Sequence, residues 1–83
     1  MEKQARIAGV GEIVVKMELN RNVIIDMNVT GDFFLLGNID GVIGRLKGTG
    51  FTSDAIAHAL EGVEMNDIIM NLTTKQFINL LTN

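Results

Sequence analysis

The spacing of apolar residues changes part-way along this chain of 83 residues. In residues 12–19 every odd position is apolar, and the same holds in residues 23–29. Alternation with period 2 predicts two half-buried strands, with Ile25 on the core face and Ile24 on the opposite face. Residues 20–22, Asn-Arg-Asn, suit a tight hairpin because Asn tolerates positive φ.

A third, short strand is predicted at residues 33–36, an apolar run that follows Gly31. Ile7 and Val10 are expected to extend the first strand towards the N-terminus. A bulge or bend is expected there, because glycine often marks an interruption within a strand pattern and glycines follow Ala8 and Val10.

From residue 38 onwards the apolar residues recur with a period of about 3.6, which predicts helices. The expected caps and stops are, in chain order, Asn38, Gly48, Thr52, Gly62 and the Thr73–Gln76 capping box. A short turn is expected around residues 66–70. The prediction is therefore a single domain, residues 1–83, of the α+β class: a two-layer sandwich with a three-stranded antiparallel sheet followed by three to four helices packed on it.

Composition narrows the classes of function. There is no cysteine, so neither disulfides nor thiolate metal sites are available. Seven basic and ten acidic residues give a net charge of −3, which argues against nucleic acid and anionic membranes as partners. No apolar run approaches a membrane span, and residues 1–4 lack the apolar core of a signal peptide. A cytoplasmic protein is the default expectation.

The sequence contains no clear motif for catalysis or phosphate binding. His58 is the only histidine and Ser53 the only serine, and neither has a partner at the spacing of a catalytic pair. Residues 9–11, Gly-Val-Gly, precede a strand instead of following one, and residues 47–49, Lys-Gly-Thr, follow a helix instead of opening one. Both contexts are wrong for a phosphate-binding loop. We therefore expect no catalytic residue and no metal site in this chain.

The stretch Gly31-Asp32-Phe33-Phe34 is the most unusual local feature, since the chain has only four aromatic residues, all Phe. Gly31 and Asp32 are interpreted as a turn that orients the two phenylalanines. If residues 33–36 form a strand, Phe33 and Phe34 point to opposite faces, and only one can enter the core. The other is covered by a helix or by the N-terminal segment, or it lies on a sheet surface that binds another domain.

Residues 29–81 resemble the C-terminal accessory domain of bacterial lipoate–protein ligases. The positions that carry the resemblance are Gly31, Asp32, Phe33, Phe34, Gly37, Leu46, Gly48, Phe51, Ala59, Leu60, Leu72, Thr73, Gln76 and Phe77. The upstream hairpin, AGVGEIVVKMELNRNVIIDMNVTG, is also similar to that family's hairpin.

The resemblance implies a role in lipoylation, a protein modification. The whole ligase uses ATP to make lipoyl-adenylate and transfers lipoate to a lysine of an acceptor protein, and this chain would bind neither ATP nor lipoate by itself. Its partner would be the catalytic domain of the ligase, in the same or a separate chain. The resemblance also implies a SufE/NifU-type fold, although sulfur and iron–sulfur chemistry are excluded here by the lack of cysteine.

Two functions therefore remain open. In the first, the segment from Gly31 to Gly37 is a structural and interface element that packs on a catalytic domain. In the second, the chain is a small stand-alone protein-interaction module that forms a homodimer through the outer face of its sheet.

Overall fold

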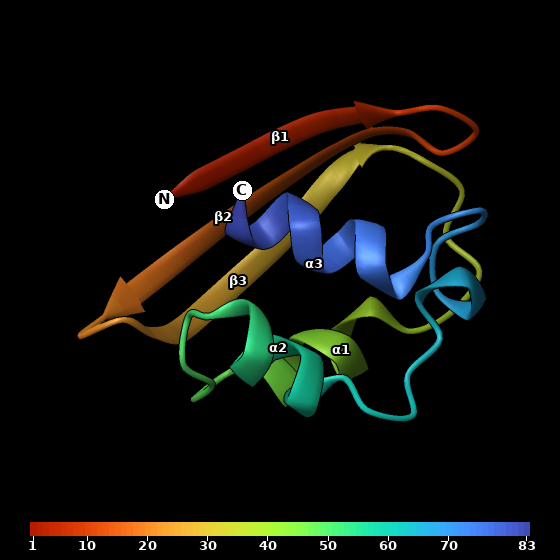
Figure 1. Cartoon of the computed structure of the whole chain (residues 1–83). Helices are drawn as coiled ribbons and strands as arrows, with labels where there is room; N and C mark the ends of the chain where they lie inside the picture. The colour runs from red at the N-terminus through yellow and green to blue at the C-terminus, as the bar shows by residue number, and fades with distance from the viewer.

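The sheet is a three-stranded antiparallel meander in which β2 lies between β1 and β3 (Figure 1). A computed structural model describes all 83 residues. The elements are β1 (Glu2–Ile7), β2 (Gly11–Asn20), β3 (Val23–Asp32), α1 (Ile39–Leu46), α2 (Ser53–Ala59), the 3₁₀ turn η1 (Met65–Asp67) and α3 (Thr74–Thr82). The predicted α+β class, with a three-stranded antiparallel sheet followed by helices, is confirmed.

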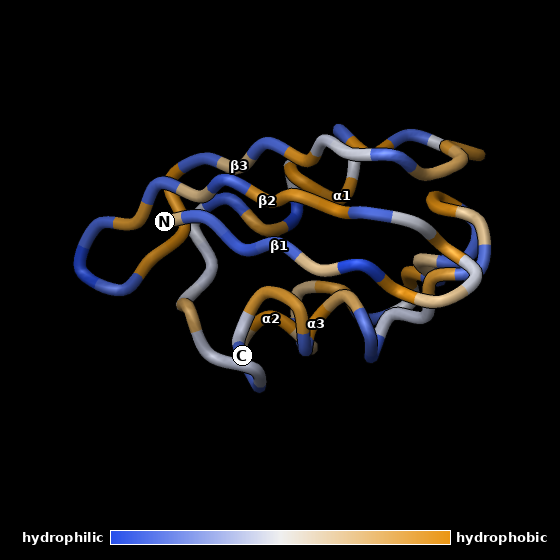
Figure 2. Tube along the Cα trace, turned by 90° about the horizontal axis from the view of Figure 1, so that it is seen from above, coloured by the Kyte–Doolittle hydropathy of each residue, from blue (hydrophilic) through white to orange (hydrophobic).

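The core lies between the sheet and the helices. α2 and α3 pack against each other, and Figure 2 shows them side by side on one side of the sheet. Fourteen apolar residues are buried, and no polar or charged side chain is. They are Ile13, Val15, Met17, Ile24, Met27, Val42, Leu46, Ile56, Leu60, Met65, Ile69, Leu72, Phe77 and Leu81. The opposite face of the sheet carries no helix and is mostly polar.

The β2–β3 hairpin forms where it was predicted, with Arg21 and Asn22 both at positive φ (52° and 63°). The predicted facing of Ile24 and Ile25 was wrong. Glu18 pairs with Asp26 but Leu19 pairs with Ile24, so β3 contains one extra residue, Ile25, at this point. A β-bulge of this kind shifts the alternation by one position. Ile24 is therefore fully buried, and Ile25 is 44% exposed.

The third strand is β1, not the segment 33–36. β1 pairs with β2 from Glu2 opposite Lys16 to Ile7 opposite Gly11, after a turn in which the Val10 N–H donates to the Ile7 carbonyl (3.0 Å). Residues 33–36 contribute only an isolated bridge, Leu35 to Ile69. The expectation that Ile7 would continue the next strand was also wrong, because the chain reverses at residues 8–10.

Gly31 and Asp32 do not form the predicted turn. They are the last two residues of β3, where Gly31 lies opposite Ile13 and Asp32 opposite Glu12. Gly31 has φ +144°, and a Cβ at this position would lie 2.1 Å from the Glu12 carbonyl oxygen. The two strands approach so closely that only glycine is accommodated here.

The helix boundaries follow the predicted signals. The Asn38 side chain caps α1, the Thr52 side chain caps α2, and Thr73 with Gln76 makes a complete capping box at α3. Gly48 follows α1 with φ +85°. α2 ends at Ala59, three residues before the predicted stop, so the residues up to Gly62 form a turn instead. The likeness to the SufE/NifU-type fold stays a prediction.

The two edges of the sheet differ. At the β3 edge, residues 48–51 act as a short extra strand: the Gly48 N–H donates to the Ile24 carbonyl (2.7 Å), and the Ile24 N–H donates to the Thr49 carbonyl (2.9 Å). The Phe51 N–H continues this pairing to the Asn22 carbonyl (2.8 Å). No segment pairs in this way with the outer edge of β1.

Candidate functional site

The ionisable side chains form no catalytic cluster. No group of three or more His, Cys, Asp or Glu side chains is placed to hold a metal ion. His58 lies on the exposed side of α2, and its Nδ1 is 3.0 Å from Glu61 Oε1, with 81% of the His58 side chain exposed. Such a pair, open to water, resembles an ordinary surface contact more than a reactive histidine. None of the helices is long and apolar enough to cross a membrane.

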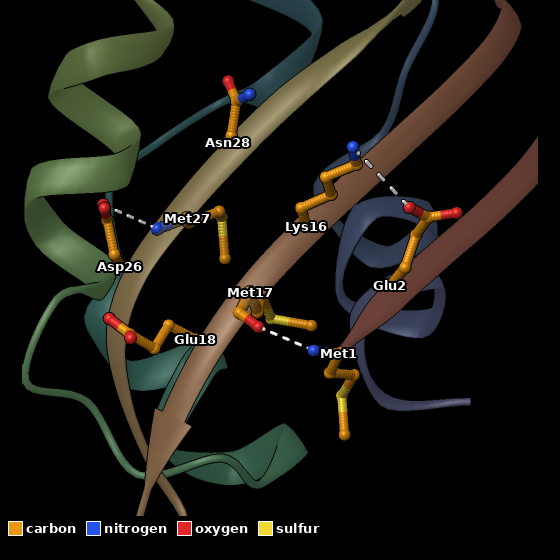
Figure 3. A pocket seen from close by; sticks show the side chains of 8 residues that line it. All are labelled: Met1, Glu2, Lys16, Met17, Glu18, Asp26, Met27 and Asn28. Atoms are coloured by element: carbon orange, nitrogen blue, oxygen red, sulfur yellow. Dashed lines mark hydrogen bonds and ion pairs between the residues drawn. The ribbon is translucent and has the colours of Figure 1, made fainter.

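The larger of two depressions lies across the three strands (Figure 3). It measures about 510 Å³ and is lined by Met1, Glu2, Lys16, Met17, Glu18, Asp26, Met27 and Asn28. Lys16 Nζ is 4.0 Å from Glu2 Oε1, and the Met1 ammonium donates to the Met17 carbonyl (2.9 Å). Lys16 and the Met1 ammonium are thus both paired with groups of the protein itself. Neither offers an unpaired charge to a ligand in the depression.

Asp26 is the one residue of this depression with a perturbed pKa. The backbone N–H of Met27 donates to its Oδ1 (2.9 Å), and Lys47 Nζ lies 3.4 Å from the same oxygen. The Met27 hydrogen bond, followed by the hydrogen bond and charge of Lys47, lowers the pKa of Asp26 below 3.8. The carboxylate is solvated, and its role is to bind the backbone at the bulge.

The outer face of the sheet is charged rather than apolar. Arg6 lies 3.8 Å from Glu12, and the Gln4 side-chain amide donates to Glu12 Oε2 (3.1 Å). Neither Phe33 nor Phe34 lies on this face, because both follow the end of β3. Of the two alternatives left open for the outward phenylalanine, a place on the sheet surface therefore does not fit the structure, and an interface at Gly31–Gly37 stays a prediction.

Four exposed apolar side chains come from two segments that lie next to each other, residues 34–36 and residue 70. Phe34 is 65% exposed, Leu35 and Leu36 are each 50% exposed, and Met70 is 41% exposed. We call these four residues the 34–36/70 patch. Large apolar side chains that are exposed together commonly mark an interaction surface.

Backbone hydrogen bonds hold the 34–36/70 patch in place. Residues 34–37 run antiparallel to residues 68–70: the Met70 N–H donates to the Phe34 carbonyl (3.0 Å), and the Leu36 N–H donates to the Ile68 carbonyl (2.7 Å). The isolated bridge between Leu35 and Ile69 completes the pairing. The patch is thus a short two-stranded element and not a free loop, which reduces the entropy lost on binding.

Phe33 and Gly37 flank this element and anchor it. Phe33 is half-buried and packs against the core, whereas Phe34 points into solvent. At Gly37, a Cβ would lie 2.8 Å from the Asp67 carbonyl oxygen and 3.1 Å from Ile68 Cδ1. The absence of a side chain at residue 37 therefore lets the two segments meet.

The other motif residues have structural positions. Leu46 and Phe77 are fully buried, and Phe51 packs against the core. Thr73 and Gln76 cap α3, with the Thr73 N–H donating to Gln76 Oε1 (2.9 Å) and the Gln76 N–H to Thr73 Oγ1 (3.0 Å). Asp32 is exposed at the end of β3. None of them converges on a pocket with Gly31–Gly37.

Comparison with known proteins identifies the family. The family model described as "Bacterial lipoate protein ligase C-terminus" matches residues 1–81. The chain belongs to this family. A curated relative, the lipoate-protein ligase LplJ of Bacillus subtilis (strain 168), is 32% identical over 72 residues, which are 87% of this chain and 22% of the relative. The chain thus spans about a fifth of the length of that ligase.

Met70 is the member of the patch that the sequence analysis did not single out. It lies 34 positions after Leu36, and only the antiparallel pairing of residues 34–37 with 68–70 brings it beside Phe34. The one available signal was the run of four apolar residues at 33–36, because in a half-buried strand alternate positions would be polar. In this lipoate protein ligase C-terminal domain, Phe33 of that run packs against the core, and the other three residues are exposed.

Proposed function

We propose that residues 1–83 form an accessory domain, or accessory subunit, of a lipoate–protein ligase that packs on a separate catalytic domain through the 34–36/70 patch. In this role it assists the ATP-dependent activation of lipoate to lipoyl-adenylate and has no catalytic residue of its own. ATP and lipoate bind the catalytic domain.

The observation that carries the proposal is the exposed apolar patch in a chain of this family. Phe34 alone is 65% exposed, in a segment whose backbone is fixed by hydrogen bonds to residues 68–70. An exposed aromatic side chain on a hydrogen-bonded backbone, beside aliphatic neighbours, has the properties of an interface anchor.

The test is reconstitution. The chain is added to an isolated catalytic domain of a lipoate–protein ligase with ATP and lipoate, and lipoyl-adenylate formation and complex formation are measured. We expect a complex and a faster activation step. Activation at an unchanged rate, with no complex detectable, would show that the accessory role is wrong.

Two variants place the interface. Phe34→Ala should fold normally, losing less than about 1 kcal/mol of stability, and bind the catalytic domain roughly 30-fold more weakly. Phe33→Ala should lose about 2–3 kcal/mol, somewhat below the cost for a fully buried phenylalanine, because Phe33 is half-buried. Ile25→Ala is the matched control, since Ile25 is exposed but outside the patch. If Phe34→Ala and Ile25→Ala bind equally well, the patch is not the interface.

A second candidate function is a stand-alone protein-interaction module. The same patch supports it, because an exposed apolar surface fits many partners. The two functions separate in the reconstitution: a module unrelated to ligation binds its own partner but neither binds the catalytic domain nor changes its rate.

A further inference from the structure

We propose that the outer edge of β1 is an interface between two copies of this chain, which join antiparallel into one six-stranded sheet across a two-fold axis at Gln4. The inference is independent of the proposed function. It rests on the direction of the backbone groups of β1, on the order of charges along this strand and on the groove beside it.

The backbone groups of β1 alternate in direction. The Met1 ammonium donates to the Met17 carbonyl (2.9 Å), and the Met17 N–H donates to the Met1 carbonyl (2.7 Å), so Met1 and Met17 form a hydrogen-bonded pair. In an antiparallel ladder such pairs alternate with pairs whose N–H and C=O groups point away from the partner strand. The register therefore points the N–H and C=O groups of Glu2, Gln4 and Arg6 outwards, at an edge where no other segment pairs.

The order of side chains along β1 suits pairing with itself. In an antiparallel arrangement centred on Gln4, Glu2 lies opposite Arg6 of the second copy, Arg6 lies opposite Glu2, and Gln4 lies opposite Gln4. These are the three residues whose backbone groups face outwards, so the register forms about six backbone hydrogen bonds. The charged pairs lie on the outer face, because Glu2, Gln4 and Arg6 are exposed and alternate with inward residues.

Existing ion pairs extend this complementarity across the joined sheet. Within one copy, Arg6 lies 3.8 Å from Glu12, and Glu2 lies 4.0 Å from Lys16. In the joined sheet, neighbouring strands then carry a row of four charged side chains: Glu12 and Arg6 of one copy, followed by Glu2 and Lys16 of the second copy. The charges of these four side chains alternate between negative and positive. Opposite charges directly across neighbouring strands stabilise a sheet, and like charges destabilise it.

The core-facing side chains of β1 also leave room for a second copy at the outer edge of this strand. Lys3, the only inward charge on β1, donates from Nζ to the Asn83 carbonyl (2.7 Å) and is thus held within its own copy. In the proposed register it lies opposite Ala5 of the second copy, which is small. A groove of about 400 Å³ separates β1 from α3, with Leu80 and side-chain amides of Gln76 and Asn79 among its lining. Apolar and amide groups are self-complementary, as a two-fold interface requires.

The experiment measures the mass of the full chain by sedimentation equilibrium between about 10 μM and 1 mM, a range suited to a small interface. We expect the mass to rise from 9.1 kDa towards twice that value. Gln4→Pro removes an N–H that the monomer does not use and puts a ring at the free edge, so it should keep the fold but weaken association at least about 30-fold. Circular dichroism and thermal unfolding check the fold of each variant.

A charge exchange defines the register. Glu2→Arg places like charges opposite each other twice in a homodimer, and so does Arg6→Glu, so each variant alone should associate roughly tenfold more weakly. When the two variants are mixed, both junction pairs become complementary again, and a mixed dimer should form. Its failure to form, a wild-type chain that stays monomeric at about 1 mM, or a dimer that survives Gln4→Pro would each overturn the proposal. The last result would assign the dimer to another surface, such as the 34–36/70 patch.

Discussion

Because of the β-bulge at Ile25, we expect alanine substitutions at Ile24 and Ile25 to change the stability of the protein by very different amounts. Ile24 is fully buried, and Ile24→Ala removes three carbon atoms from the core. The transfer term is about 2.4 kcal/mol, and the cavity left behind raises the total cost to about 3–4 kcal/mol. Ile25 is 44% exposed, so Ile25→Ala loses about half of the transfer term and leaves no cavity, at a cost of about 1 kcal/mol.

Urea and thermal unfolding followed by circular dichroism measure both changes. For a domain of this size, the loss at Ile24 corresponds to a fall in Tm of roughly 12–30 °C, against roughly 4–8 °C at Ile25. The dependence of unfolding free energy on urea should stay the same, because neither variant changes the surface exposed on unfolding by much. A larger loss for Ile25→Ala than for Ile24→Ala would mean that β3 alternates without a bulge, and that the register of the hairpin is wrong.

Two further predictions concern two glycines and the charge of Asp26. Gly31→Ala should lower the free energy of unfolding in urea by several kcal/mol, because its Cβ would lie 2.1 Å from the Glu12 carbonyl oxygen. Gly44→Ala should instead stabilise the protein by about 1 kcal/mol, because Gly44 lies inside α1 and its Cβ would meet nothing within 4 Å. Equal effects of the two substitutions would contradict the close approach of β2 and β3 at Gly31. The folded-state pKa of Asp26 lies below its ordinary value of 3.8, so its carboxylate stabilises the fold above that pH and loses this contribution as the pH falls through the folded pKa. NMR titration of the Asp26 carboxyl checks the direction, and Lys47→Met should raise the pKa partway, since the Met27 hydrogen bond remains.

The helices could be predicted from the sequence because their signals are local. Asn38, Thr52 and the pair Thr73 and Gln76 cap helices through side-chain hydrogen bonds to residues two or three positions away. The β2–β3 hairpin is equally local, since positive φ at two residues closes it. In these places the residues that decide the structure are neighbours in the chain.

Apart from the early end of α2, the errors concern pairings between distant or offset residues. β1 has only Ala5 and Ile7 as inward apolar residues, so its strand character comes from pairing with β2 and is nearly invisible in its own pattern. The bulge at Ile25 exists only relative to β2, and a period-2 reading cannot detect an extra residue. Segment 33–36 was given a strand of its own because its partner, residues 68–70, lies far along the chain.

In the 34–36/70 patch, too, features set by neighbouring residues could be predicted and features set by distant pairings could not. The motif from Gly31 to Gly37 was visible in the sequence, and so was the rule that Phe33 and Phe34 should differ. Which of the two is exposed depends on how the chain leaves β3, and the involvement of Met70 depends on the hydrogen bond from its N–H to the Phe34 carbonyl. The role of this surface in binding stays a prediction.

The contact between Lys3 Nζ and the Asn83 carbonyl (2.7 Å) brings the two ends of the described chain together beside β1 (Figure 1). A short linker could therefore join residue 83 to residue 1 without crossing the core. New termini could then open at Arg21 and Asn22, in the exposed β2–β3 turn. The order of elements along such a permuted chain would begin with β3 and the helices and end with the β1–β2 hairpin, with every strand pairing of the sheet kept. The arrangement of the two ends thus makes the described chain suitable for circular permutation.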